Sequence, residues 1–245
     1  MDASEYANIA RLETRHWYYI GKRRLVRYWL ERYGPPRKDE VLLDCGAGTG
    51  VFAGEMAAQC RVMVLDDHEE SLRLLRERFA PEQILSLSGE EIPLPAASLD
   101  YVTALDVLEH VPNDRAAVDG FARVLRPGGL AVVTVPASMA LWSDWDVTLH
   151  HFRRYDRTGL AALFEAEAWT IEHVNYTNVV AFPAVWFLRR WRKLRPAKTT
   201  GANRAEDRVP GPAMNRLLEM LFVGFGRSRC PFPFGVSLVL VARRR

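Results

Sequence analysis

The sequence predicts an α/β fold with a doubly wound, mostly parallel sheet of seven strands and a helical insertion before the last strand. Between residues 41 and 176, short apolar runs alternate with segments of helical periodicity. The first run, Val41–Cys45, leads into the glycine turn Gly46–Gly50, which opens a helix. Glycines in such a turn allow a sharp bend and a close approach to a ligand. We therefore expect a ligand site at the carboxyl end of the first strand.

The individual elements follow from this alternation in chain order. An aromatic and basic helix is predicted over residues 14–33, and it ends at Gly34-Pro35-Pro36. Apolar or alternating runs predict the seven strands, which are 41–45, 61–65, 83–87, 98–106, 130–135, 169–176 and 235–243. Helical periodicity predicts the connecting helices, which are 51–59, 68–80, 113–125 and 158–168.

This pattern divides the chain into four segments. Residues 1–40 are expected to form a helical cover or lid, 41–177 a cofactor-binding core, 178–234 a helical insertion and 235–245 the last strand of the core. A length of 245 residues suits one domain with an insertion. The three cysteines predict neither disulfides nor a metal site, and with no recognisable signal peptide they favour a cytoplasmic location.

The acid Asp44 stands two residues before the first glycine of the turn. A carboxylate there would repel a pyrophosphate but attract an ammonium group. The spacing Gly-x-Gly-x-Gly also differs from the Gly-x-Gly-x-x-Gly of dinucleotide sites, which disfavours a nicotinamide oxidoreductase. Both features favour a cationic nucleoside with an amino-acid tail, such as S-adenosyl-L-methionine.

Four segments, in this order, resemble the motifs of class I S-adenosylmethionine-dependent methyltransferases of the small-molecule and quinone type. They are the glycine turn with its acid (44–50), Asp66 after the second strand, Leu108–Val111 after the fourth, and the turn Arg126–Gly129 before the fifth. The resemblance implies a Rossmann-like methyltransferase fold and S-adenosyl-L-methionine as cofactor. It leaves the methyl acceptor open.

The resemblance also implies where the cofactor lies. An acid after the second strand accepts hydrogen bonds from the ribose hydroxyls. Asp66 matches this place best, and Asp67 is the alternative. An acid after the third strand accepts a hydrogen bond from the adenine amino group. Glu90 matches that place, and Glu91 is the alternative.

The carboxyl end of the fourth strand lies beside the methyl donor in such sheets, which makes Asp106 and Val107 site residues. In the predicted lid, Trp17 would stack on the cofactor and Arg23 would bind its carboxylate. Glu109 is expected to do no more than hold a loop. The predicted cofactor-binding residues are Asp44, Gly46, Ala47, Gly48, Gly50, Asp66, Asp67, Glu90, Glu91, Asp106, Val107, Trp17 and Arg23.

Histidines supply the candidates for acid–base catalysis. Methyl transfer from a sulfonium mainly needs alignment of the reacting atoms, but an oxygen acceptor benefits from a base. His110 follows the fourth strand, and His150 and His151 lie in the long loop 136–157. The imidazole pKa lies near physiological pH, which suits this role. The spacing does not choose among the three.

The insertion combines two apolar helical segments with the arginine-rich run Arg189–Pro196. Residues 41–140 carry 7 basic and 15 acidic side chains, whereas the rest of the chain carries 26 basic and 15 acidic ones. Basic flanks and amphipathic helices predict contact with an anionic membrane surface, at the inner membrane face, and a small-molecule or lipid-linked acceptor. A helical cap over a pocket or a dimer interface is the alternative.

Two further functions remain as alternatives. The basic flanks are also compatible with a nucleic-acid methyltransferase, although no RNA-binding module is recognisable. Moreover, no amino-methylating motif of the Asn-Pro-Pro-Tyr or Asp-Pro-Pro-Tyr kind follows the fourth strand. A non-catalytic, membrane-associated protein that binds S-adenosylmethionine would also have this fold. Loss of a motif glycine or of Asp66 would have favoured it, and all of these residues are present.

Overall fold

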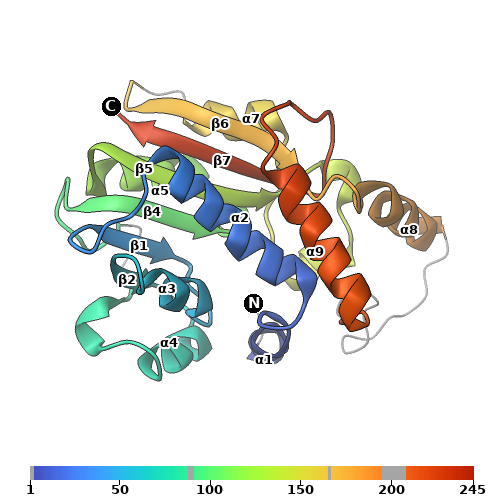
Figure 1. Ribbon diagram of the computed structural model, residues 1–245, viewed down its shortest axis with the longest axis horizontal. Coiled ribbons are helices and arrows are strands. Elements are labelled where there is room, and N and C mark those ends of the chain that lie inside the picture. The colour runs from blue at the N-terminus through green and yellow to red at the C-terminus, as the bar shows by residue number, and fades with distance from the viewer. Residues whose placement is uncertain (1–2, 88–90, 165–166, 195–207) are drawn as a thin grey trace.

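The computed structural model describes residues 3–87, 91–164, 167–194 and 208–245. In this part of the chain seven strands form one sheet in the order β3-β2-β1-β4-β5-β7-β6 (Figure 1). The strands are β1 Val41–Cys45, β2 Arg61–Leu65, β3 Ile84–Leu85, β4 Leu99–Leu105, β5 Leu125–Pro136, β6 Trp169–Thr177 and β7 Ser237–Arg244. The predicted fold class is confirmed.

The α-helices are α1 Ala3–Leu12, α2 Trp17–Tyr33, α3 Val51–Met56, α4 Glu69–Arg76, α5 Asp114–Val124, α6 Asp144–Thr148, α7 Arg157–Leu163, α8 Phe182–Leu194 and α9 Pro212–Gly226. Short 3₁₀ turns are η1 Pro81–Gln83, η2 Leu108–His110 and η3 Met139–Leu141. Helices cover both faces of the sheet, as Figure 1 shows.

Strands β1 to β5 pair in parallel, and only β7 of the described strands runs antiparallel to its neighbours β5 and β6. The chain leaves β1 towards β2 on one side and later returns to β4 on the other. The pairs Cys45–Leu65 and Cys45–Ala104 place the carboxyl ends of the three strands side by side. This topological switch point is where open α/β sheets bind ligands.

Alternation along the strands divides the core between the two faces of the sheet. Leu43 of β1 packs in the cluster that includes Phe121 of α5 and Phe164 next to α7. Its neighbour Leu42 packs in the other cluster, with Trp29 of α2 and residues of α3 and α9. Period-two alternation explains why adjacent strand residues are both buried, since each face has its own helical layer.

The structure differs from the sequence prediction in several places. The segment predicted to begin a helix at residue 14 is broken near His16, which caps α2, and the separate helix α1 precedes it. The third strand is only two residues long, and β5 begins five residues before the expected start. The loop 136–157 contains η3 and α6. These differences depend on tertiary contacts that local periodicity does not encode.

The insertion places two helices at one end of the molecule. Helix α9 lies across α2, and a Cβ on Gly21 of α2 would lie 2.8 Å from the ring of Phe222. The absence of a side chain at Gly21 therefore allows this close helix contact. No helix among the described residues is long and apolar enough to span a membrane.

Candidate active site

The turn after β1 uses a left-handed backbone at three glycines. The φ angles are +64° at Gly46, +58° at Gly48 and +76° at Gly50, values that L side chains rarely adopt. A Cβ on Gly46 would lie 2.5 Å from Val107 after β4, whereas a Cβ on Gly48 would meet nothing within 4 Å. Gly46 thus allows the two strand ends to meet, and Gly48 borders open space that a ligand can approach.

The first acid of the site, Asp44, lies near the end of β1 and is 3% exposed. Its Oδ1 accepts a hydrogen bond of 2.7 Å from Thr103 Oγ1 of the adjacent strand β4. Burial raises the pKa of Asp44 to about 7, although the Thr103 hydrogen bond lowers it. A cationic ligand next to this carboxylate would favour its charged form.

The second acid, Asp66, follows β2 and is also buried. Its Oδ2 accepts a hydrogen bond of 2.9 Å from the N–H of Gly48, and its Oδ1 accepts bonds of 3.0 Å from the N–H groups of Asp67 and His68. Asp66 thus connects the glycine turn to the start of α4. Asp67, the alternative acid, is exposed.

At the end of β4, Asp106 adopts a left-handed φ of +57°. Thr134 Oγ1 donates to its Oδ1 at 2.9 Å, and Lys22 Nζ of α2 lies 2.6 Å from its Oδ2. Burial alone would raise the pKa of Asp106, but the charge and hydrogen bond of Lys22 hold it below the usual value. Helix α2 is therefore joined to this strand end by an ion pair.

The N-terminal helices also approach the turns at the carboxyl edge of the sheet. The ring of Tyr6 in α1 stacks on His68 at 4.4 Å between centroids. Burial raises the pKa of Tyr6, and Asp66 and Asp67 add to this effect. Glu13, between α1 and α2, accepts a hydrogen bond from Thr49 of the glycine turn. Helix α1 thus lies next to the region where the sequence predicts the ribose.

Two predicted lid residues have protein partners in this structure. Arg23 is buried, and it donates to Glu55 Oε1 at 2.9 Å and to the carbonyl of Glu13 at 2.6 Å. Trp17 lies against Phe222 of α9, with 6.1 Å between ring centroids. Their direct contacts with the cofactor stay predictions.

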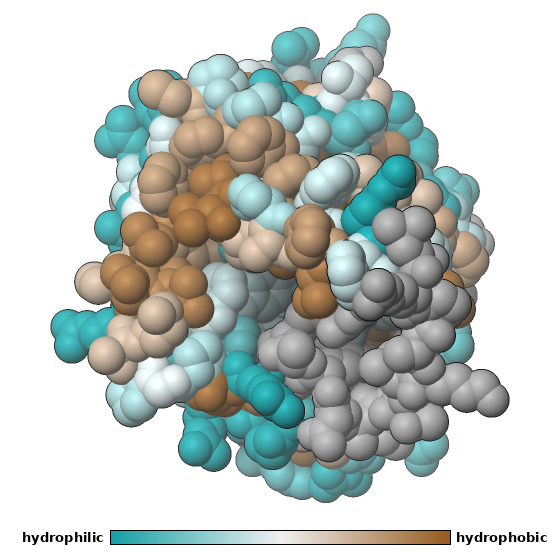
Figure 2. All heavy atoms as spheres, turned by 90° about the vertical axis from the view of Figure 1, so that its right-hand side faces the viewer, coloured by the Kyte–Doolittle hydropathy of each residue, from teal (hydrophilic) through white to brown (hydrophobic). Residues whose placement is uncertain are grey.

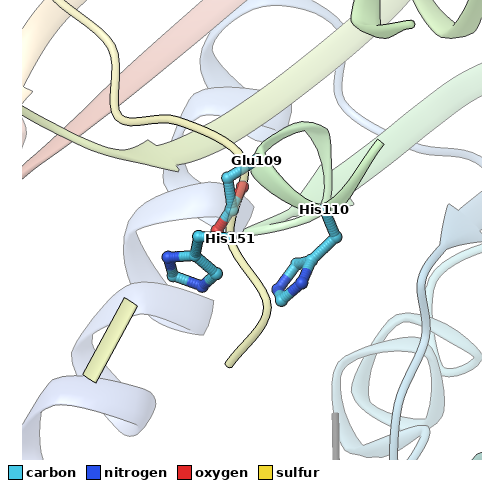
Figure 3. Close-up of side chains that lie close together, drawn as sticks. All are labelled: Glu109, His110 and His151. Carbon is cyan, nitrogen blue, oxygen red and sulfur yellow. The ribbon is translucent and has the colours of Figure 1, made fainter. Parts of the chain in front are cut away.

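A cluster of three side chains lies just beyond the end of β4. One ligand atom from each of Glu109, His110 and His151 lies within 4.8 Å of the others (Figure 3). Burial and the neighbouring His151 lower the pKa of His110 to about 4. His150 is exposed and does not belong to this cluster. The structure therefore brings together two of the three histidines that the sequence predicts.

The carboxyl group of Glu109 is the unusual member of this cluster. Glu109 is fully buried, and neither side-chain oxygen has a hydrogen-bond partner among the described residues. Burial raises its pKa well above the usual value, and the charge of Asp106 adds to this. Its backbone carbonyl accepts a hydrogen bond from Phe152, as expected for a residue that holds the loop, but this does not account for its side chain.

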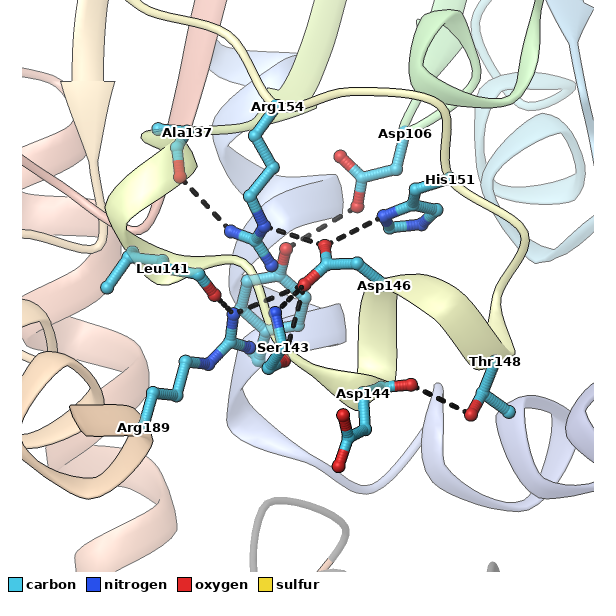
Figure 4. Close-up of polar contacts among 11 residues, drawn as sticks. Asp106, Ala137, Leu141, Ser143, Asp144, Asp146, Thr148, His151, Arg154 and Arg189 are labelled. Atoms are coloured by element: carbon cyan, nitrogen blue, oxygen red, sulfur yellow. Dashed lines mark hydrogen bonds and ion pairs between the residues drawn. The ribbon is translucent and has the colours of Figure 1, made fainter. Parts of the chain in front are cut away.

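His151 is oriented by a buried acid, Asp146 of α6 (Figure 4). Its Nδ1 lies 3.0 Å from Asp146 Oδ1, which also accepts a hydrogen bond of 2.6 Å from Arg154 Nε. Arg189 of α8 lies 3.7 Å from Asp146 Oδ2. Although burial opposes the charge, the bond with His151 and the charge of Arg154 hold the pKa of Asp146 below its usual value. The insertion is thus tied to the loop that carries His151.

The remaining predicted residues are less informative. Glu90 lies outside the described residues, and Glu91 is exposed in the loop before β4. Sequence reasoning missed Lys22, Asp146 and the side chain of Glu109. Lys22 directly precedes Arg23, which was the predicted residue. Asp146 is five residues before His151. Only the fold shows that these side chains face the site.

The sheet order, the antiparallel last strand and the acid-flanked glycine turn at the switch point define a class I S-adenosylmethionine-dependent methyltransferase fold. Comparison with known proteins agrees with this class. Residues 43–133 match the family described as "Methyltransferase domain". Several curated relatives are described as S-adenosylmethionine-dependent methyltransferases.

Two curated relatives are similar over part of their length. A probable S-adenosylmethionine-dependent methyltransferase of Mycolicibacterium smegmatis is 30% identical over 65% of this chain and 62% of its own length. A ubiquinone biosynthesis O-methyltransferase of Albidiferax ferrireducens is 30% identical over 52% of this chain and 56% of its own length. The match thus spans less than two thirds of either relative.

A solved structure shows the same fold at low sequence identity. The structure of a putative sarcosine dimethylglycine methyltransferase from Galdieria sulphuraria has a TM-score of 0.62 and 15% identity. The match covers 92% of this chain and 86% of that one. The predicted fold and the resemblance to class I methyltransferases are therefore confirmed, and these matches leave the acceptor open.

The buried Asp146 network predicts a large effect of one small substitution. Asp146→Asn leaves Arg154 buried without its carboxylate, and we expect a loss of about 3–5 kcal/mol in the free energy of unfolding. Urea unfolding followed by circular dichroism measures this. Asp144→Asn, an exposed position in the same helix, is the control and should change stability by less than about 0.5 kcal/mol. Equal stability of the two variants would contradict the assigned network.

Proposed function

We propose that the protein transfers the methyl group of S-adenosyl-L-methionine to an oxygen atom of a small-molecule acceptor. The observation that supports binding of S-adenosyl-L-methionine is the left-handed glycine turn between two buried acids. Asp44 attracts the ammonium of the methionine tail, and Asp66 accepts hydrogen bonds from the ribose hydroxyls. Glu90, or its alternative Glu91, accepts a hydrogen bond from the adenine amino group.

The methyl group of a cofactor in this orientation lies near the end of β4, beside Asp106 and Val107. In-line transfer requires the acceptor oxygen on the far side of that methyl group. His110 and His151 follow on η2 and the loop after α6, and they form the wall that faces the acceptor. The oxygen would form a bond to the methyl carbon as the carbon–sulfur bond breaks, and the electron pair would stay on sulfur in S-adenosylhomocysteine. The proton of the acceptor hydroxyl would pass to solvent.

Similarity to ubiquinone biosynthesis O-methyltransferases supports an oxygen acceptor on a small molecule. The surface of the insertion supports a lipid-linked one. Figure 2 shows hydrophobic side chains gathered on the end of the molecule that carries α8 and α9. The exposed large apolar residues on these helices are Trp186, Phe187, Trp191, Met214, Leu217, Met220 and Phe225. We propose that this surface contacts an anionic membrane from which the acceptor is taken.

The ribose assignment can be tested with two neighbouring acids. Asp66→Asn removes an acceptor that faces the glycine turn, so we expect affinity for S-adenosylmethionine to fall by about 10- to 100-fold, which is about 1.4–2.7 kcal/mol. Asp67→Asn is the matched control and should bind within about twofold of wild type, because that side chain is exposed. Isothermal titration calorimetry measures both. If Asp67→Asn has the larger effect, the ribose acid is Asp67.

The raised pKa of Asp44 predicts a pH dependence of cofactor binding. As the pH rises towards 7, a growing fraction of the Asp44 carboxyl group is ionised and attracts the ammonium, so the association constant should rise about tenfold between pH 5.5 and 6.5. The rise should level off as the pH passes about 7. Asp44→Asn should bind weakly with little pH dependence over this range. A wild-type affinity that is flat across it would contradict the role of Asp44.

Membrane contact predicts selective binding to anionic vesicles. Co-sedimentation should recover the protein with vesicles that contain phosphatidylserine and much less with phosphatidylcholine alone, because exposed Arg190 and Arg216 lie on the apolar helices. A double substitution, Trp186→Ser with Phe187→Ser, should reduce recovery by about tenfold. Equal recovery with both vesicle types, or no recovery with either, would contradict contact with an anionic membrane. A cap over the acceptor would then be the role of α8 and α9.

A further inference from the structure

We propose that Glu109, His110 and His151 bind a divalent transition-metal cation of the Zn²⁺ class next to the acceptor. The binding site stands on its own geometry, and only its role in catalysis rests on the proposed function. This inference revises the expectation, drawn from the cysteines, that the chain has no metal site. No cation is assigned by the family match or by the fold.

The three side chains come from two separate segments that the fold brings together. Glu109 and His110 lie on η2 after β4, and His151 lies in the loop after α6. Their ligand atoms lie within 4.8 Å of one another. Zinc binds nitrogen and oxygen at about 2.0–2.2 Å in a tetrahedral arrangement, so two ligand atoms on one ion lie about 3.3–3.6 Å apart. Side-chain shifts of about an ångström would bring the three ligand atoms onto one ion.

The buried carboxyl group of Glu109 is the observation that points to a ligand. A buried polar group without a partner costs roughly 1–3 kcal/mol, and a buried charge costs more. Neither oxygen of Glu109 has a partner among the described residues, although two imidazoles lie close by. A cation would bind the carboxylate and remove this cost. Glu109 holds the loop through its backbone carbonyl, so this structural role does not explain its side chain.

His151 already has the orientation typical of a metal ligand. Its Nδ1 lies 3.0 Å from Asp146 Oδ1, and a proton on Nδ1 directed at this carboxylate leaves Nε2 with a free lone pair. Metal-bound histidines in proteins commonly donate their other N–H to a carboxylate in this way. Asp146 is itself fixed by Arg154 and by the N–H of Ser143. The imidazole is therefore held in place before any ion binds.

The donor set and its position define the ion and its role. Two imidazoles and one carboxylate suit Zn²⁺, Co²⁺ or Mn²⁺ better than Mg²⁺ or Ca²⁺, which prefer oxygen ligands. Val107, which packs against Gly46 of the glycine turn, precedes Glu109 by two residues, so the ion would lie near the methyl donor. Three protein ligands leave a position for the acceptor hydroxyl. The cation lowers the pKa of that hydroxyl, whose proton passes to solvent before the oxygen attacks.

Metal binding can be measured without enzymatic turnover. The full-length protein is treated with a chelator and titrated with Co²⁺, whose d–d absorption reports coordination by nitrogen and oxygen. We expect one Co²⁺ per chain at this site, displaced by Zn²⁺ but not by equal Mg²⁺. Glu109→Gln keeps the size of the buried side chain and should weaken Co²⁺ binding by about 100-fold or more. His151→Gln should do the same.

Two controls separate metal binding from folding and from the donor site. Glu82→Gln changes an exposed acid and should bind Co²⁺ like wild type. Calorimetry of Glu109→Gln with S-adenosylmethionine should give wild-type affinity, which shows that the fold and the donor site are intact. The proposal is overturned if the wild type gives no Co²⁺ absorption, or if Glu109→Gln binds Co²⁺ as tightly as wild type. If the wild type does not bind S-adenosylmethionine in the same experiment, the proposed function is refuted instead.

Discussion

The hydrogen bond between the N–H of Gly48 and the carboxylate of Asp66 fixes the geometry on which the site depends. It joins the turn after β1 to the end of β2, while contact of Val107 with Gly46 joins the same turn to the end of β4. Three strand ends are thereby held in one arrangement. Because Gly46 has no side chain, the segment after β4 can approach the turn without displacing it. The glycine turn and the segment after β4 therefore have a fixed relative position.

Buried charge provides the second constraint on this edge of the sheet. Asp106 is compensated by the distant Lys22. Asp146 is compensated by the nearby Arg154 and the distant Arg189. Lys22 joins α2 to the end of β4, and Arg189 joins α8 to the loop that carries His151. Loss of one partner of a buried ion pair destabilises the fold, because the other charge stays buried without compensation. Helix α2 and the insertion are therefore joined by ion pairs to the carboxyl edge of the sheet and are not separate attachments.

Much of this arrangement could be predicted from the sequence because its signals are local. The turn 46–50 follows an apolar strand directly, and Asp44 and Asp66 stand at strand ends that a parallel sheet must bring together. What could not be predicted depends on contacts between residues far apart in the chain. Lys22 and Asp106 are separated by 84 positions in the sequence. Arg23, which is adjacent to Lys22 and also basic, was predicted as the site residue instead. The sequence pattern cannot tell which of two neighbouring helix residues faces the site.

In the histidine cluster, the buried side chain of Glu109, which has no hydrogen-bond partner among the described residues, distinguishes between two roles of the histidines. An oriented pair of Asp146 and His151 is compatible with a general base and equally with a metal ligand, since both need an imidazole held by a carboxylate. Glu109 distinguishes between them. A base would gain nothing from a second, buried carboxyl group that makes no hydrogen bond with a described residue. A cation would gain a charged ligand in surroundings of low polarity, where the attraction is strong. The position of Glu109 therefore favours the cation over the base.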